Sequence, residues 1–334
     1  MRKVIGLIAA AGLTVALVAG CGAPSQDTMV NKLKSETQTL SQQNYTSTAM
    51  MTVQTDNTSQ TYYIHTNYEG PNQYRIELGD SSKNVNQIIV KNNNGMYIVS
   101  PSLQKVFRFN GNWAQNQGHI YLYDQILQQV IQSASQKQAK MTEANGTYTF
   151  ELPITPANDV VAKEKVEISS KTMKPTQVVL YDKQGTAVVL IKFTSFQTGV
   201  TFQNADFDPY KLASSGTAKT TAVSQSEFGY VLPTTTFQDK LDVAEPMAQN
   251  DYLLRYTGPD GFTLSEFRPG PGAAGLPNAS LVDLYGVPAL ETTAGKTHQL
   301  MWLQNGVEFS LTSSSLSPTE MEAVAISTFG QIGK

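Results

Sequence analysis

The residue with the most distinctive chemical context is Cys21, the only cysteine of the 334-residue chain. Arg2 and Lys3 give the chain a positively charged start, an apolar run fills residues 4–20, and small residues directly precede the cysteine. A charged start, an apolar stretch and a small-residue cleavage site together make a secretory signal peptide. A transmembrane anchor fits less well, because the run is shorter than the roughly 20 residues that cross a bilayer and is interrupted by Gly12. The lone thiol at the cleavage site predicts lipid attachment.

The segment Val18-Ala19-Gly20-Cys21 resembles the lipobox of bacterial lipoproteins. That resemblance implies that the Cys21 thiol is acylated, with chains such as palmitate, and becomes the first residue of the mature protein. Residues 1–20 are then a lipoprotein signal peptide and residues 21–26 a tether. We expect a protein that is lipid-anchored on the extracytoplasmic face of the cell membrane. An ordinary signal peptide with an incidental cysteine is the alternative.

The composition is that of a folded protein with an uncharged polar surface. Hydrophobic residues make up 40% of the chain, and the length suits two domains of ordinary size. Removing Arg2 and Lys3 with the signal peptide leaves 22 basic residues against 27 acidic ones, a net charge of −5. This balance argues against nucleic acid as a partner, because such proteins need a basic surface.

Few residues offer catalytic chemistry. His65, His119 and His298 are far apart in sequence, none lies in a metal-binding pattern, and no second cysteine is available. Gly295-Lys296-Thr297 looks like the end of a phosphate-binding loop, but Leu290 stands where the first glycine of that loop would be. No Gly-x-Ser-x-Gly nucleophile motif is present. We therefore expect no catalytic residues, no metal, no cofactor and no enzymatic activity.

The first two thirds of the chain alternate strand patterns with two helical ones. Asp27 can cap a helix that reaches about residue 43, and Leu122, Ile126 and Val130 lie at helical spacing in a second helix that ends near Ala134. Turn residues between short β-rich runs indicate neighbouring antiparallel strands. The predicted strands are 45–54, 61–68, 73–78, 86–91, 96–100, 104–109, 139–144, 147–153, 163–169, 176–182, 186–196 and 200–204.

A polar stretch without apolar periodicity, residues 213–225, predicts a linker between a domain at 27–212 and a smaller α+β domain at 226–334. Ser317-Pro318-Thr319-Glu320 is a capping box that opens a terminal helix. The run 268–275, rich in glycine and proline, is expected to be a surface loop, with a lid as the alternative. Further strands are predicted at 229–232, 252–257, 262–267, 280–285, 287–292, 297–304 and 307–312.

The strand phrase Lys174-Pro175 to Asp182-x-x-Gly185, followed by a return strand and Phe207-Asp208-Pro209, resembles the end of the LolA/LolB/LppX type of bacterial lipoprotein fold. The likeness covers about residues 27–212. It implies an α+β fold in which a curved antiparallel half-barrel sheet wraps helices around an apolar cavity for lipid or acyl chains. The hairpin and helix after Met301 resemble the small C-terminal domain of LolA-like lipoproteins of Gram-positive bacteria, and the two-domain layout resembles RseB-type regulators.

One face of the predicted strands and one face of the second helix would line such a cavity. The same apolar alternation is also what an ordinary packed core requires, so a solid core is the alternative. The candidate lining residues are Met51, Val53, Tyr62, Ile64, Ile76, Ile88, Val90, Met96, Ile98, Leu122, Ile126 and Val130.

Two classes of function follow. In the first, a membrane-anchored lipoprotein binds or handles lipid, or the acyl chains of a lipoprotein, in the apolar cavity. In the second, a non-enzymatic sensor or assembly factor binds a membrane-protein partner in the envelope, as the resemblance to RseB-type regulators and to sporulation and germination lipoproteins implies. Lipid that copurifies with the protein would favour the first class.

Overall fold

The computed structural model describes residues 24–54, 59–113, 120–154, 161–215, 229–247 and 251–329. Cys21, the signal peptide, His119 and most of the predicted linker lie outside the described residues. Among the residues described, no helix has the length and apolar character needed to cross a membrane.

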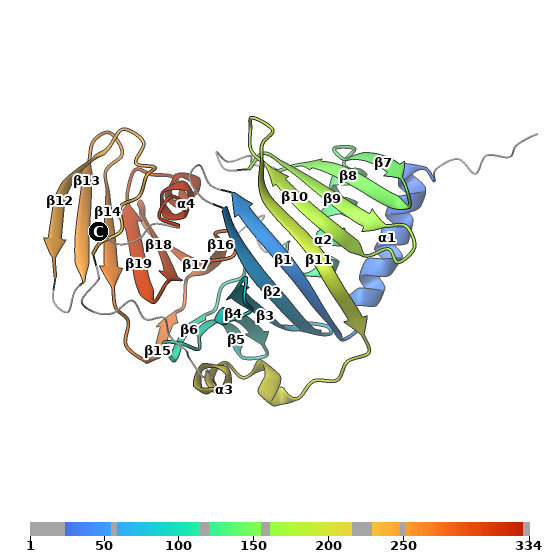
Figure 1. Cartoon of the computed structure of the whole chain (residues 1–334), viewed down its shortest axis with the longest axis horizontal. Helices are drawn as coiled ribbons and strands as arrows, with labels where there is room; N and C mark the ends of the chain where they lie inside the picture. The colour runs from blue at the N-terminus through green and yellow to red at the C-terminus, as the bar shows by residue number, and fades with distance from the viewer. Residues whose placement is uncertain are drawn as a thin grey trace, which may run out of the picture.

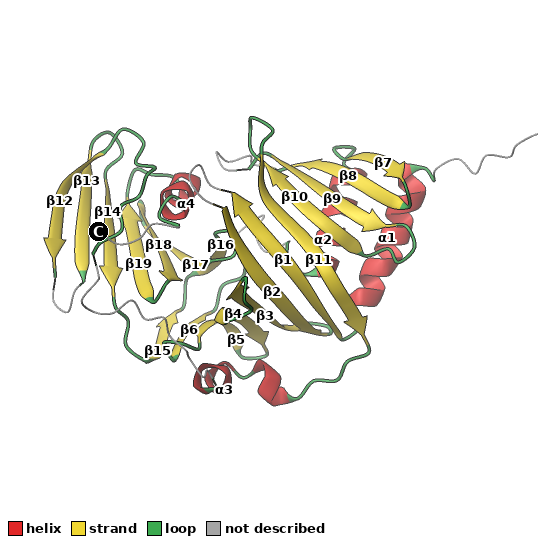
Figure 2. Ribbon diagram, viewed as in Figure 1, coloured by secondary structure: helices red, strands yellow, loops and turns green. Residues whose placement is uncertain are grey.

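The larger sheet has twelve strands and consists mainly of two antiparallel meanders (Figures 1 and 2). Strands β1 and β11 pair with each other and join the two meanders, so the sheet stays open at both edges. This is the curved, half-barrel arrangement that the resemblance to the LolA/LolB/LppX type implied. The first meander is β1 (Tyr45–Gln54), β2 (Ser59–Glu69), β3 (Gln73–Asp80), β4 (Val85–Asn92), β5 (Gly95–Ser100) and β6 (Lys105–Phe109); the second is β7 (Lys140–Ala144), β8 (Thr147–Pro153), β9 (Lys163–Ser169), β10 (Pro175–Tyr181) and β11 (Ala187–Thr198).

Two helices lie on the concave face of this sheet, behind the strands in Figure 1. Helix α1 (Gln26–Leu40) begins earlier than predicted, because the Ser25 side chain, rather than Asp27, accepts the capping hydrogen bond. Helix α2 (Tyr123–Ser135) confirms the predicted second helix and packs against α1, β8 and β10. Its buried residues follow the helical spacing seen in the sequence.

Two short helices cover part of the convex face. The 3₁₀-helix η1 (Asn204–Phe207) and helix α3 (Pro209–Ser214) pack over β3–β6. The strand predicted at 200–204 is wrong: the chain there leads into η1, where Gln203 and Asp206 form a capping box. The Asp206 carboxylate accepts from the backbone N–H of Gln203 at 2.8 Å, which favours the turn over a strand.

The second sheet has seven antiparallel strands in the order β12-β13-β14-β19-β18-β17-β16. The predicted strand at 229–232 is wrong, because the backbone N–H of Val231 donates to the buried carboxylate of Glu266 instead of to a neighbouring strand. The sequence missed β12 at the edge. The elements are β12 (Lys240–Pro246), β13 (Tyr252–Thr257), β14 (Phe262–Phe267), β16 (Ser280–Asp283), β17 (Pro288–Ala294), β18 (Thr297–Gln304), β19 (Val307–Ser313) and α4 (Pro318–Ile326).

The two sheets are joined by backbone pairing. The surface loop predicted at 268–275 is wrong in its second half, which forms most of β15 (Gly272–Leu276); this strand pairs in parallel with β6 and so belongs to the larger sheet. A bridge between Trp113 and Leu281 adds a second connection, and one hydrophobic core runs through both parts. The division into domains at 27–212 and 226–334 stays a prediction.

Candidate functional site

Ten of the twelve predicted lining residues face the concave side of the larger sheet. They belong to one core, in which Tyr62 is partly buried and the others are at most 4% exposed. The strands contribute Met51, Val53, Tyr62, Ile64, Ile76, Met96 and Ile98, and the helix side contributes Leu122, Ile126 and Val130.

The prediction that Ile88 and Val90 line the cavity is wrong, because both residues lie on the convex face. Successive side chains of a strand point to opposite faces, and it is Ile89 that lies opposite Ile76 on β3 and Ile98 on β5. Ile88 and Val90 pack instead in a second cluster together with Phe207 and Ala213. They cannot line the concave face.

Helices α1 and α2 cover the half of the concave face formed by the second meander. One buried acid faces α2 there: the Glu164 side chain, 2% exposed, accepts from Gln129 Nε2 at 2.6 Å. Burial raises the pKa of Glu164 to about 7. Glu164 Oε1 and Gln129 Oε1 have no hydrogen-bond partner. If Glu164 is protonated, its hydroxyl can serve as the donor that the two unpaired oxygens, Glu164 Oε1 and Gln129 Oε1, otherwise lack.

An aromatic group closes the end of the concave face where α2 begins. Tyr45 stacks on Tyr68 with ring centroids 4.8 Å apart, and Tyr123 packs against Phe193 and Phe196. The Tyr45 hydroxyl lies 3.4 Å from the Asp124 carboxylate and also accepts from the backbone N–H of Tyr123. These contacts fix the start of α2 on the sheet.

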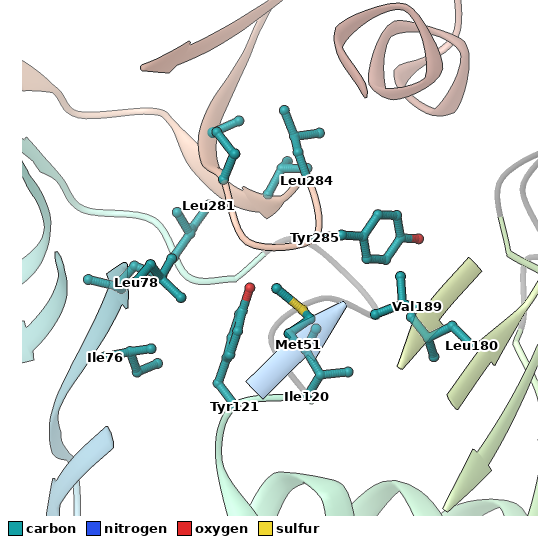
Figure 3. Close-up of a cluster of buried hydrophobic side chains, with 14 of the residues drawn as sticks. Met51, Ile76, Leu78, Ile120, Tyr121, Leu180, Val189, Leu281, Leu284 and Tyr285 are labelled. Atoms are coloured by element: carbon teal, nitrogen blue, oxygen red, sulfur yellow. The ribbon is translucent and has the colours of Figure 1, made fainter. Parts of the chain in front are cut away.

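The other half of the concave face is covered by residues 279–287, which we call the inserted hairpin (Figure 3). It comprises β16 and the turn that leads to β17. Leu281 and Leu284 are fully buried and Tyr285 is 7% exposed. In Figure 3 Leu281 lies beside Leu78 of the sheet, whereas Tyr285 extends toward Val189 and Leu180. The hairpin thus occupies the space above β1–β3.

A polar clamp holds the turn of the inserted hairpin. The Tyr121 hydroxyl donates to Asp283 Oδ1 at 2.6 Å, and the backbone N–H of Gly286 lies 3.0 Å from the same oxygen and 3.2 Å from the Tyr121 oxygen. Burial raises the pKa of Asp283 to about 6, and the hydrogen bonds from Tyr121 and Gly286 oppose that rise. The clamp compensates part of the cost of burying a carboxylate.

The turn itself approaches the sheet closely. A Cβ at Gly286 would lie 2.6 Å from Met51 Cε and 2.9 Å from Tyr62 Cδ2, so only glycine fits without a shift. Tyr285 and Gly286 both have positive φ, 53° and 99°, as a type I′ hairpin turn requires. Two predicted lining residues, Met51 and Tyr62, therefore contact the protein's own chain.

Sequence reasoning missed Tyr121, Asp283 and Gly286. The Tyr-Gly pair between two β-rich runs was a usable signal for a turn, but nothing in the sequence says that this turn is buried. A narrow cleft continues from the hairpin between the two sheets, lined by Ile98 and Phe107 on one side and by Leu290 and Met301 on the other.

The described residues keep their metal-ligating side chains apart. They contain no grouping of three histidine, cysteine or acidic side chains suited to a metal ion. His65 lies on β2, while His298 lies on β18, where its Nδ1 is 3.7 Å from Glu291. The concave face is apolar and is covered by elements that are not hydrogen-bonded strands of the larger sheet.

Comparison with known proteins gives a family match and weaker structural likenesses. The family of YdcC-like sporulation proteins matches residues 1–207. The chain is 28% identical to sporulation protein YdcC of Bacillus subtilis (strain 168) over 346 residues, which covers 100% of this chain and 99% of that protein.

Among solved structures, the complex of MucA and MucB from Pseudomonas aeruginosa contains a chain with 13% identity and a TM-score of 0.35, over 89% of this chain and 97% of that one. A putative outer-membrane lipoprotein-sorting protein domain from Vibrio parahaemolyticus has 12% identity and a TM-score of 0.33, over 57% of this chain and 100% of that one.

Proposed function

The chain belongs to the family of YdcC-like sporulation proteins, and from that premise we propose that it is a membrane-anchored, non-enzymatic protein of the cell envelope that binds acyl chains on its concave face. The acyl chains would belong to a lipid or to another lipoprotein. The observation that carries the proposal is the continuous apolar surface of an open sheet, covered by α1, α2 and the inserted hairpin.

The anchor would be acylated Cys21. Ser25, the cap of α1, follows it by four residues, which span at most about 14 Å when extended. Helix α1 would therefore begin beside the membrane. An acyl chain that leaves the bilayer would have a short path to a protein held so close, which favours a role in lipid handling at the membrane surface.

The charges of the core fit an apolar ligand. The buried charged residues among those described are all acidic: Asp124, Glu164, Asp239, Glu266, Asp283 and Glu322. A lysine or arginine that could pair with a phosphate or carboxylate headgroup is not among them. The concave face would therefore take the hydrocarbon part of a lipid and leave its headgroup outside.

Binding of a fluorescent fatty acid, 11-(dansylamino)undecanoic acid, tests the proposal on a soluble form that begins at Gly22. We expect saturable binding that is lost when Ile126→Trp fills space under α2. Val90→Trp is the matched control, since both residues are fully buried but Val90 lies on the convex face. Overpacking costs about 1–3 kcal/mol in either place, so urea unfolding must accompany the titration. Equal binding by both variants would contradict the proposal.

A second candidate is an assembly factor that binds a membrane-protein partner. It is favoured by the uncovered convex face of β1 and β11, which is rich in hydroxyl groups: Thr48 Oγ1 lies 2.8 Å from Thr194 Oγ1 and 2.6 Å from Ser195 Oγ. A stoichiometric partner crosslinked to the full-length protein in sporulating cells, and retained by Ile126→Trp, would support this candidate.

A further inference from the structure

We propose that the inserted hairpin is a removable occupant of the acyl site, so that the C-terminal part of the chain closes the concave face and an acyl chain binds by displacing it. The inference rests on the proposed function, because it assigns the regulation of the same site. The hairpin and the ligand would exclude each other, since both need the surface above Met51 and Tyr62.

The position of the hairpin supports this exchange. Its turn lies against the side chains that the sequence predicted to contact a ligand, with Gly286 above Met51 and Tyr62. Leu281 lies beside Leu78 and Tyr285 lies by Val189 (Figure 3), and both are buried side chains of the kind that an acyl chain would replace. The hairpin therefore buries the apolar side chains of the concave face away from water, as a bound hydrocarbon chain would.

Hydrogen bonds attach the hairpin to the larger sheet at its base and at its turn. At its base, the backbone N–H of Leu281 donates to the Asn112 carbonyl at 3.0 Å, beside the bridge to Trp113. At its turn, the Tyr121 hydroxyl holds Asp283. Its remaining strand partner, β17, belongs to the smaller sheet. The turn can therefore leave the concave face without breaking a strand pair of β1–β6.

When the turn of the inserted hairpin is packed on the concave face, it has unfavourable features that would be relieved if the turn moved away. Tyr285 has a φ of 53°, a conformation that is rare for a bulky side chain and costs free energy. The Asp283 carboxylate is buried and faces Tyr121 and Tyr62, and its negative charge acts on Glu322 of α4. A buried carboxylate beside a second acid is costly. These features are consistent with a hairpin that can move away from the concave face.

The test compares two glycine substitutions in the same soluble form. Gly286→Ala pushes the turn against Met51, whereas Gly295→Ala places an alanine at a similar positive φ, +64°, with no atom within 4 Å. Backbone strain is thus present in both variants and the collision in only one. We expect Gly286→Ala to bind the dansyl fatty acid at least fivefold more tightly than the unsubstituted protein, and Gly295→Ala to bind it unchanged.

Hydrogen exchange of residues 279–287 reports the displacement directly. The N–H group of Gly286 lies 3.2 Å from the Tyr121 hydroxyl oxygen when the hairpin covers the sheet, so we expect it to exchange faster when the fatty acid is bound. If Gly286→Ala fails to fold, Tyr121→Phe removes the hydroxyl of the clamp and must show the same tighter binding.

The outcomes separate the inference from the function on which it rests. The inference would be overturned if the fatty acid binds saturably while the hairpin amides stay protected from hydrogen exchange, and if Gly286→Ala and Tyr121→Phe bind it with unchanged affinity. The acyl site itself would then still stand. Absence of fatty-acid binding in the unsubstituted protein, in Gly286→Ala and in Tyr121→Phe would overturn the proposed function itself. Tighter binding and faster exchange together would support both.

Discussion

We expect Glu164→Gln to stabilise the protein at pH 8 and to leave its stability unchanged at pH 4. Glu164 lies on β9 beneath α2, and its carboxylate is 2% exposed. Gln129 Nε2 donates to one carboxylate oxygen, while the other oxygen and Gln129 Oε1 have no partner. A glutamine at position 164 has an amide that can donate to Gln129 Oε1 and carries no charge.

The magnitude follows from the pKa of Glu164, which burial raises from 4.5 to about 7. One pKa unit corresponds to about 1.4 kcal/mol, so the ionised carboxylate costs at most ~3 kcal/mol of unfolding free energy. Between pH 4.5 and 7 the folded state holds a proton that the unfolded state has lost. The contribution of Glu164 is therefore full below pH 4.5 and is lost as the pH rises through 7.

The assay is urea unfolding of both proteins from pH 4 to pH 8.5. Glu266, Asp283 and Glu322 also have pKa values raised by burial, to about 7, 6 and 8, so both proteins should lose stability as the pH rises. The difference between them isolates Glu164. Glu167→Gln, on the other face of the same strand, is the control. Parallel pH curves for Glu164→Gln and the unsubstituted protein would refute the reasoning.

Two further predictions concern the anchor and the contact between the two sheets. Cys21→Ala should leave the protein unprocessed or released from the membrane, because no thiol remains to be acylated; incorporation of labelled fatty acid equal to that of the unsubstituted protein would contradict this. Gly111→Ala should destabilise the protein by about 1–3 kcal/mol, because the new Cβ would overlap the carbonyl oxygen of Ala279, whereas Gly270→Ala meets no atom within 4 Å. Urea midpoints that fall equally in both glycine variants would contradict this second prediction.

The sequence predicted antiparallel neighbours within each meander, because these strands pair with their neighbours in the chain. Asn-Gly and similar turns mark hairpins locally, and the spacing of Leu122, Ile126 and Val130 marks one helix face. The face of β4 could not be assigned in this way. Ile88, Ile89 and Val90 form an apolar run without alternation, so only the pairing with β3 and β5 shows which side chain points inward.

The cover of the site depends on contacts between distant segments. Strand β15 lies in a glycine- and proline-rich run that has no strand pattern, and it forms because β6, more than 160 residues earlier, offers a free edge. The burial of Tyr285 and Gly286 likewise depends on Tyr121 and Met51. Local propensity carries no information about such partners. Ten of the twelve side chains proposed for the concave face could be placed there from the sequence, whereas the inserted hairpin that covers it could not be predicted.

Native mass spectrometry of the soluble form mixed with palmitate tests the acyl site most directly. The account predicts one palmitate bound per chain, lost in Ile126→Trp and retained in Val90→Trp, because only Ile126 faces the concave surface. A protein that carries no palmitate at saturating concentration, or that keeps it equally in both variants, would contradict the account.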